Sequence, residues 1–157
     1  EATFPAFVIA PQCKGPWKYV GDDEQLIMDS IVAAQREWRI DSKRIYLTGL
    51  SQGGCSTFDL GAKYSDRWAG LVVVCGAGTL SDASRIIAPT WVFHGERDEV
   101  VPPSGPHQWD KNNVGGRDMA KRIMGAEYTE YHGADHFIWD RTYADPALWE
   151  WLFAQKR

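Results

Sequence analysis

The sequence predicts an α/β fold in which a mostly parallel sheet is covered by helices on both faces. Several short runs are apolar throughout, as is typical of strands that are buried on both sides. These runs alternate along the chain with segments of helical character. At 157 residues and 44% hydrophobic, the chain is long enough to bury about 70% of its unfolded surface. No repeat or linker divides it, so we expect a single domain over residues 1–157.

The strands are predicted from their apolar and β-branched character. FVIA is stopped by Pro11, RIYLT follows a turn at Asp41, and two later runs contain LVVVC and TWVFH. The final strand, EYTEY, precedes a glycine-containing turn. The predicted strands are residues 7–10, 44–48, 71–75, 89–94 and 127–131.

Helices are predicted between and after these strands. The first begins at an acidic cluster and carries Ile27, Ile31, Ala34 and Trp38 at the spacing of one helical face. The next follows the glycines after Ser51, and the last runs from Pro146 to Gln155. The predicted helices are residues 23–38, 53–64, 116–124 and 146–155.

Charge and composition exclude several classes of function. The net charge is −4 with both signs interspersed, so no basic stripe for nucleic acid and no polybasic membrane patch is present. The longest apolar run, residues 69–75, is too short to span a bilayer. We therefore expect a soluble protein with a small neutral, cationic or apolar ligand. The three cysteines lack CxxC spacing and do not reveal a redox compartment; Cys55 and Cys75 are expected to be buried thiols.

The pentapeptide GLSQG, residues 49–53, lies between a predicted strand and a predicted helix. In that setting a serine sits on a sharp, strained turn, and the flanking glycines let strand and helix approach closely. The pentapeptide alone is weak, because ordinary Gly and Ser usage produces it by chance in roughly several per cent of chains this long. Its position makes Ser51 a candidate nucleophile. A phosphate-cradling loop is the weaker interpretation, because the lysine and the glycine pattern of such loops are lacking.

A serine needs a base, and the base needs an orienting carboxylate. Both are expected in loops after later strands, in the order Ser, Asp, His. Asp98 in HGERDEVVP and His136 in HGADHF meet this requirement. Other carboxylates and histidines lie nearby. The carboxylates are expected to be solvated; of the histidines, His94 is expected to pack, His107 to lie in a loop, and His132 to be too close to the strand end to move freely. These competitors are Glu96, Glu99, Asp135, His94, His107 and His132.

The chain resembles the α/β-hydrolase fold over nearly its whole length. The segments that carry this resemblance are VIAPQC, DSKRIY, GLSQGG, HGERDEVVP and the C-terminal DHFIWDRTYADPALWEWLFAQKR. Within this fold, the chain is similar to serine esterases of the dienelactone hydrolase, polyhydroxybutyrate depolymerase and feruloyl or acetylxylan esterase branch, often labelled predicted peptidases. The resemblance implies hydrolysis of a small carboxylic ester through an acyl-enzyme, with Ser51 as nucleophile, His136 as general base and Asp98 as acid. It also favours a secreted or periplasmic location.

The family pattern also requires an oxyanion hole. Gln52 is expected to supply one backbone N–H, whereas the HG-rich loop that normally supplies the second is not in this sequence. By pattern, residues 7–10 resemble the fourth of eight strands, so the fold is expected to be truncated at its N-terminal side. Three interpretations follow: part of a longer enzyme, a sheet completed by self-association or a partner segment, or a non-catalytic binding domain derived from half of a hydrolase.

The substrate is expected to be a short-chain or aromatic ester. A peptidase of the same fold is the alternative, but amide cleavage demands a complete oxyanion hole. Four aromatic residues fall in or beside loops at the expected catalytic edge: Trp17, Trp109, Phe137 and Trp139. They are candidates for lining an apolar or aromatic substrate pocket, and ordinary packing is the alternative. No metal or organic cofactor is called for, because no histidine pair, P-loop or dinucleotide fingerprint is present.

Overall fold

The computed structural model describes residues 4–12, 22–108 and 110–157. The chain forms two compact units, Glu1–Ile40 and Asp41–Arg157. The second unit contains the sheet and the predicted site residues that the structure describes. Trp17 and Trp109, both singled out from the sequence, lie outside the described residues.

A four-stranded parallel sheet forms the centre of the second unit. Its order is β1-β2-β4-β6, and the strands are β1 (Tyr46–Leu50), β2 (Gly70–Val74), β4 (Thr90–Gly95) and β6 (Glu127–Tyr131). Leu50 pairs with Val74, and Val74 pairs with Phe93. This register aligns the carboxyl ends of the strands at one edge of the sheet, where α/β folds place their ligands.

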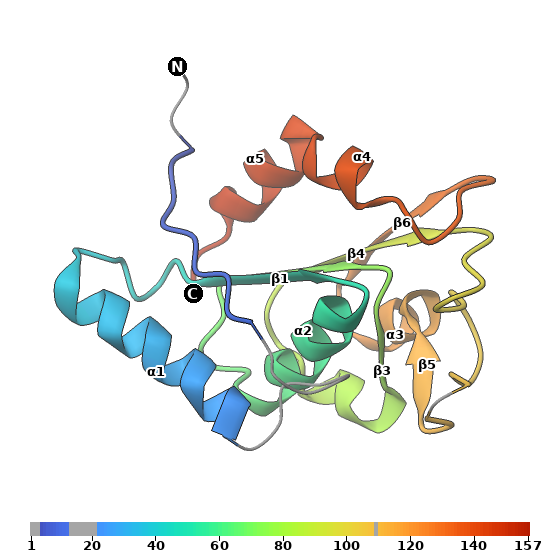
Figure 1. The fold of residues 1–157 in the computed structure, drawn as a ribbon, viewed down its shortest axis with the longest axis horizontal. Coiled ribbons are helices and arrows are strands. Elements are labelled where there is room, and N and C mark those ends of the chain that lie inside the picture. Colours follow the sequence, from blue (N-terminus) through green and yellow to red (C-terminus); the bar gives the residue numbers. More distant parts are fainter. Residues whose placement is uncertain (1–3, 13–21, 109) are drawn as a thin grey trace. The chain divides into compact units, whose positions relative to one another are not determined.

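Helices cover both faces of this sheet (Figure 1). On one face lie α2 (Gln52–Lys63) and α3 (Gly116–Arg122); on the other lie α4 (Trp139–Tyr143) and α5 (Pro146–Ala154). The central strand β2 is buried along its whole length. Val72 and Val74 pack with Leu148 and Leu152 of α5, in one hydrophobic cluster. The continuous apolar run in β2 is therefore explained by its two covered faces, and the predicted α/β fold class is confirmed.

Several short elements were not predicted from the sequence. They are β3 (Ala77–Thr79), η1 (Leu80–Arg85), β5 (Asn113–Gly115) and α4. Strands β3 and β5 form an antiparallel pair, and the Thr79 hydroxyl donates a hydrogen bond to Asn113 Oδ1 at 2.9 Å. Segments of three residues are too short for a hydrophobic period, so only long-range pairing defines them.

The first unit contains α1 (Asp22–Glu37), as the amphipathic spacing predicted. Ile27 and Ala34 are buried, but Trp38 lies beyond the helix end, where its ring stacks on Phe7 with centroids 5.3 Å apart. The strand predicted over residues 7–10 is wrong: no strand forms there, and Val8 is 73% exposed. Apolar character does not create a strand unless a neighbour pairs with its backbone, and no described segment pairs with this one.

Among the residues that the structure describes, no helix combines the length and apolar character needed to cross a membrane.

Candidate active site

Ser51 occupies the single-residue turn between β1 and α2. Its backbone has φ 52° and ψ −116°, a left-handed conformation that costs a non-glycine residue about 1–3 kcal/mol. The Ser51 N–H donates to the Val74 carbonyl at 2.9 Å, which extends the β1–β2 ladder by one bond. The side chain is thereby fixed at the carboxyl edge of the sheet, in the strained strand-to-helix turn that the sequence pattern predicted.

The two glycines of the pentapeptide have different surroundings. A Cβ on Gly49 would lie 2.2 Å from the Gly53 carbonyl oxygen, so strand and helix touch backbone to backbone there. A Cβ on Gly53 would meet nothing within 4 Å. The close approach therefore requires Gly49, whereas the expectation that Gly53 also serves it is wrong.

The structure brings Ser51, Asp98 and His136 together at this edge. His136 lies in the loop after β6, and its Nε2 is 2.9 Å from Ser51 Oγ. Asp98 lies in the loop after β4, and its Oδ2 is 2.7 Å from His136 Nδ1. Both Asp98 and His136 are buried, so the two hydrogen bonds are largely shielded from water.

The surroundings of Asp98 keep it ionised. Burial alone would raise the pKa of this carboxyl, but hydrogen bonds from His136, His94 and the Val101 N–H outweigh it and hold the pKa well below its usual range. Because an ionised carboxylate only accepts, His136 Nδ1 carries the proton and donates to Asp98. His136 Nε2 is then the acceptor for the Ser51 hydroxyl. This is the protonation pattern that a serine base requires.

Cys75 supports the same loop from beneath, a contact that the sequence did not reveal. It directly follows β2 and has φ 51°. Its buried thiol donates to the His136 carbonyl oxygen at 3.1 Å. Burial and the nearby Asp98 charge raise the pKa of the Cys75 thiol to about 12. Within the described part of the chain, Cys75, Asp98 and His136 are a group with metal-ligand atoms close together. The Cys75 thiol and the Asp98 carboxylate are already engaged in hydrogen bonds with His136.

Gln52 is the first residue of α2. Its backbone N–H is one of those that a helix leaves without an intrahelical partner, and the helix dipole favours negative charge at this end. The position fits the predicted oxyanion donor. A second donor stays unassigned. The Gln52 side-chain Nε2 is also buried, without a hydrogen-bond partner among the described residues.

Two aromatic residues flank His136. Phe137 and Trp139, here called the aromatic ledge, have ring centroids 5.0 Å apart, and both meet the imidazole edge to face. Phe137 is 71% exposed, although it directly follows a buried residue. An exposed aromatic ring beside Ser51 and His136 offers a surface for an apolar or planar group of a ligand.

The competing residues have other surroundings. Glu96 is not simply solvated: it accepts from the Gly133 N–H at 2.7 Å and pairs with exposed His132, also at 2.7 Å. His107, expected in a loop, is buried, and its backbone N–H donates to the Asn113 carbonyl oxygen at 2.7 Å. His94, expected only to pack, is fully buried and lies against Asp98.

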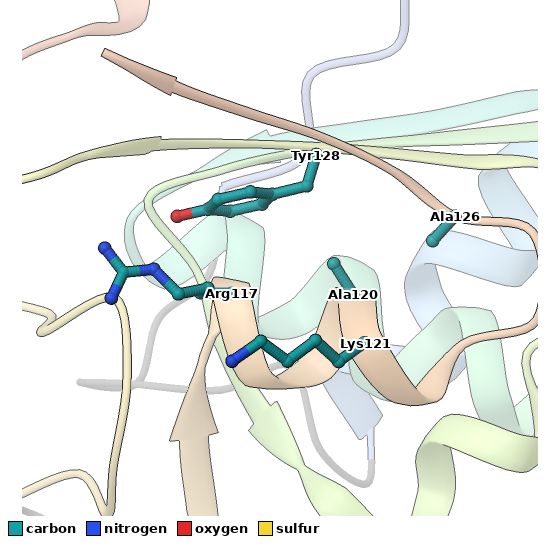
Figure 2. A pocket seen from close by; sticks show the side chains of 5 residues that line it. All are labelled: Arg117, Ala120, Lys121, Ala126 and Tyr128. Atoms are coloured by element: carbon teal, nitrogen blue, oxygen red, sulfur yellow. The ribbon is translucent and has the colours of Figure 1, made fainter. Parts of the chain in front are cut away.

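A surface hollow lies between α3 and β6 (Figure 2). Its lining residues are Arg117, Ala120, Lys121, Ala126 and Tyr128. Glu130 accepts from Arg117 Nε at 2.9 Å and from the Tyr128 hydroxyl at 2.6 Å. The guanidinium group at this hollow is therefore already paired within the protein.

Comparisons with known proteins agree with this geometry. A thermostable esterase of known structure superimposes with a TM-score of 0.77 and 32% identity, over 90% of this chain and 39% of the esterase. The chain therefore has the fold of the α/β hydrolases. A monoacylglycerol lipase of Paleococcus ferrophilus shares the fold, with a TM-score of 0.63 and 16% identity over 85% of this chain and 75% of the lipase.

A bifunctional acetylxylan esterase/xylanase of Neocallimastix patriciarum is 31% identical over 81 residues, which are 50% of this chain and 12% of that protein. No protein-family model matches the chain. This chain thus spans 39% of the length of the thermostable esterase and 12% of the length of the bifunctional enzyme.

Proposed function

We propose that this hydrolase cleaves carboxylic esters with Ser51 as nucleophile, His136 as general base and Asp98 as the orienting acid. The observation that carries the proposal is the continuous relay from Ser51 Oγ through His136 to Asp98, with distances of 2.9 Å and 2.7 Å. An imidazole with an ionised carboxylate on Nδ1 and a serine hydroxyl on Nε2 is arranged for acyl transfer.

The reaction proceeds in two halves. His136 Nε2 takes the proton of Ser51 as Oγ attacks the ester carbonyl, and the imidazolium then protonates the leaving alcohol. The acyl group remains on Ser51 until a water molecule, deprotonated by His136, attacks and releases the acid. Negative charge on the carbonyl oxygen is stabilised by the Gln52 N–H and the positive end of α2. Since this supplies one donor, a second donor would add roughly 10²- to 10³-fold to the turnover rate.

For the substrate, we propose short-chain or aromatic esters. Phe137 is 71% exposed beside His136, which supports contact with an aryl acyl group or an aryl alcohol. The similarity to an acetylxylan esterase supports small acyl groups as well. Peptides are less suited, because amine leaving groups need stronger transition-state stabilisation.

The proposal is tested by hydrolysis of p-nitrophenyl acetate. The chain should release nitrophenolate in proportion to its concentration, and Ser51→Ala should reduce the rate by at least about 10³-fold, because the attacking oxygen is removed. A fluorophosphonate probe should label Ser51, identified by peptide mass spectrometry. Ser81, an exposed serine, provides the matched control as Ser81→Ala. Equal rates for the unaltered chain and Ser51→Ala, with no labelling of folded protein, would instead favour the non-catalytic binding domain.

The role of the aromatic ledge is tested separately. Phe137→Ala should raise KM for p-nitrophenyl benzoate by roughly 10-fold, the loss expected for about 1.4 kcal/mol of aromatic contact. The value of kcat should change little, since Phe137 holds no proton of the relay. Thermal stability should also be unchanged because the ring is largely in solvent. An unaltered KM for both benzoate and acetate esters would exclude the ledge from substrate binding.

A further inference from the structure

His94 is a second imidazole next to Asp98, and it faces the same carboxylate oxygen as His136. It lies in β4, four residues before Asp98, and its side chain is fully buried, with 0% exposed. Its Nε2 is 2.8 Å from the Val101 carbonyl oxygen and 3.3 Å from Asp98 Oδ2. A single ring nitrogen therefore faces both the carboxylate of the relay and the loop that carries it.

These partners fix the state of the His94 ring. A carbonyl oxygen only accepts, so Nε2 must carry a proton and donate it. The other nitrogen, Nδ1, has no hydrogen-bond partner in the part of the chain that the structure describes. A Cβ on Gly116 would lie 2.7 Å from Nδ1, so the start of α3 closes against this side of the ring. A proton on Nδ1 would be a buried donor without an acceptor, which favours the neutral ring with hydrogen on Nε2.

The Asp98 carboxylate is held from three directions. Oδ1 accepts from the N–H groups of Val100 and Val101, at 2.9 Å and 2.8 Å. Oδ2 accepts from His136 Nδ1 at 2.7 Å and faces His94 Nε2. The backbone donors fix Oδ1 within its own loop. His94 is the side chain that ties Oδ2 to the sheet, because its own backbone pairs with β6.

We propose that His94 is a positioning residue that holds the Asp98 carboxylate in the plane and orientation that His136 requires. It does so by sharing one Nε2–H between Asp98 Oδ2 and the Val101 carbonyl, which fixes the acid-bearing loop against β4. The consequence for ester hydrolysis rests on the proposed function. The effect on the His136–Asp98 hydrogen bond does not.

The first test is NMR of the full chain labelled with ¹⁵N-histidine. His94, assigned by its loss in His94→Gln, should be neutral with hydrogen on Nε2. A His94 ring with its proton on Nδ1 would overturn the proposal without the need for any variant. In the unaltered protein, the His136 Nδ1–H should give a strongly downfield proton signal because it donates to an ionised carboxylate.

Two substitutions then separate positioning from simple packing. His94→Leu fills similar space without a donor, and His94→Gln places an amide N–H near the position of Nε2. The His136 Nδ1–H signal should shift or vanish in the leucine variant and return toward its original position in the glutamine variant. His132→Gln is the matched control, since His132 is exposed and pairs with Glu96.

Kinetics provide the second readout. In His94→Leu, kcat should fall by roughly 10- to 100-fold with KM nearly unchanged, the effect of losing one hydrogen bond to a charged group. His94→Gln should recover most of the lost kcat. An unchanged His136 signal in folded His94→Leu overturns the proposal even if activity falls. Absence of esterase activity in the unaltered chain would refute the proposed function, while the NMR comparison would still decide the role of His94.

Discussion

At the scale of single residues, the site depends on backbone positions that tolerate few side chains. Ser51 adopts φ 52° because the turn between β1 and α2 holds a single residue. That turn exists only because Gly49 lets the strand touch the helix backbone. This strain falls on the residue whose hydroxyl must project from the sheet edge, as is common at functional sites.

Gly49 and Gly53 provide a matched pair of substitutions. Gly49→Ala should lower the free energy of unfolding by about 3 kcal/mol or more, since its Cβ would clash with rigid backbone. Gly53→Ala should raise it by about 0.5–1 kcal/mol, because the position is open and helical. Urea unfolding followed by circular dichroism measures both values. The same destabilisation in both variants would contradict this account of the turn.

At the scale of secondary-structure elements, strand ends and helix starts place the chemistry. β1 delivers Ser51, β4 delivers His94 and the loop with Asp98, and β6 delivers the loop with His136. The acid-bearing loop is further anchored on α3, where Asp118 accepts from the Gly105 N–H at 2.8 Å. On the opposite face, α5 packs on β2 and closes the core beneath the His136 loop.

The N-terminus of α5 gives a prediction for this scale. Asp145 Oδ1 accepts from the Ala147 N–H at 2.9 Å, and Pro146 occupies the first helical position. Asp145→Ala should therefore lower the free energy of unfolding by about 1 kcal/mol. Asp145→Asn keeps the acceptor oxygen and should cost much less. The comparison is made by thermal unfolding, and equal losses in the two variants would show that the side-chain oxygen contributes no cap.

At the scale of the whole molecule, stability is linked to pH through three carboxyl groups. Hydrogen bonds to Asp98, outweighing its burial, lower the pKa of this carboxyl. The Gly105 N–H lowers the pKa of Asp118. Burial raises the pKa of Glu130, but hydrogen bonds from Tyr128 and Arg117 outweigh it and the net direction is downward. All three groups are therefore more acidic in the folded state than in the unfolded chain.

The sign of the effect follows from linkage. Carboxyls with a lowered pKa in the folded state stabilise it fully above their unfolded pKa of about 4, and this contribution is lost as pH falls through the folded values. The contribution of these three carboxyls to the free energy of unfolding should thus be nearly constant above about pH 5 and fall steadily below about pH 4. Urea titrations at several pH values measure it. Asp118→Asn should reduce the slope; a rise in stability on acidification would contradict the assignment.

Assembly is also a property of this scale. In the described part of the chain, β1 pairs with β2 alone and is the terminal strand of the sheet. Self-association or a partner segment that completes the sheet stays a prediction, as does a single domain over residues 1–157. Analytical ultracentrifugation of the chain over a range of concentrations would measure its self-association.

Much of the fold was accessible from the sequence because its signals are local. Continuous apolar runs identified β2 and β4, and β-favouring residues identified β6 and the approximate position of β1. The spacing of Ile27 and Ala34 identified α1. The order of Ser51, Asp98 and His136 after successive strands was enough to predict that they meet, because parallel strands end at a common edge. The hydrophobic period of a helix or strand depends on residues close together in the chain, and the order of the site residues is given by the sequence itself.

Tertiary structure decided what depends on partners distant in the chain. Residues 7–10 have the composition of a strand, but pairing is a property of two segments, and the structure gives this one no strand. Cys75 and His94 gave no site signal because one ends an apolar run and the other resembles a packed strand residue. Their contacts with His136 and Asp98 arise only when β2, β4 and β6 lie side by side. The sequence determined which groups could react, and the packing of the sheet determined what holds them in place.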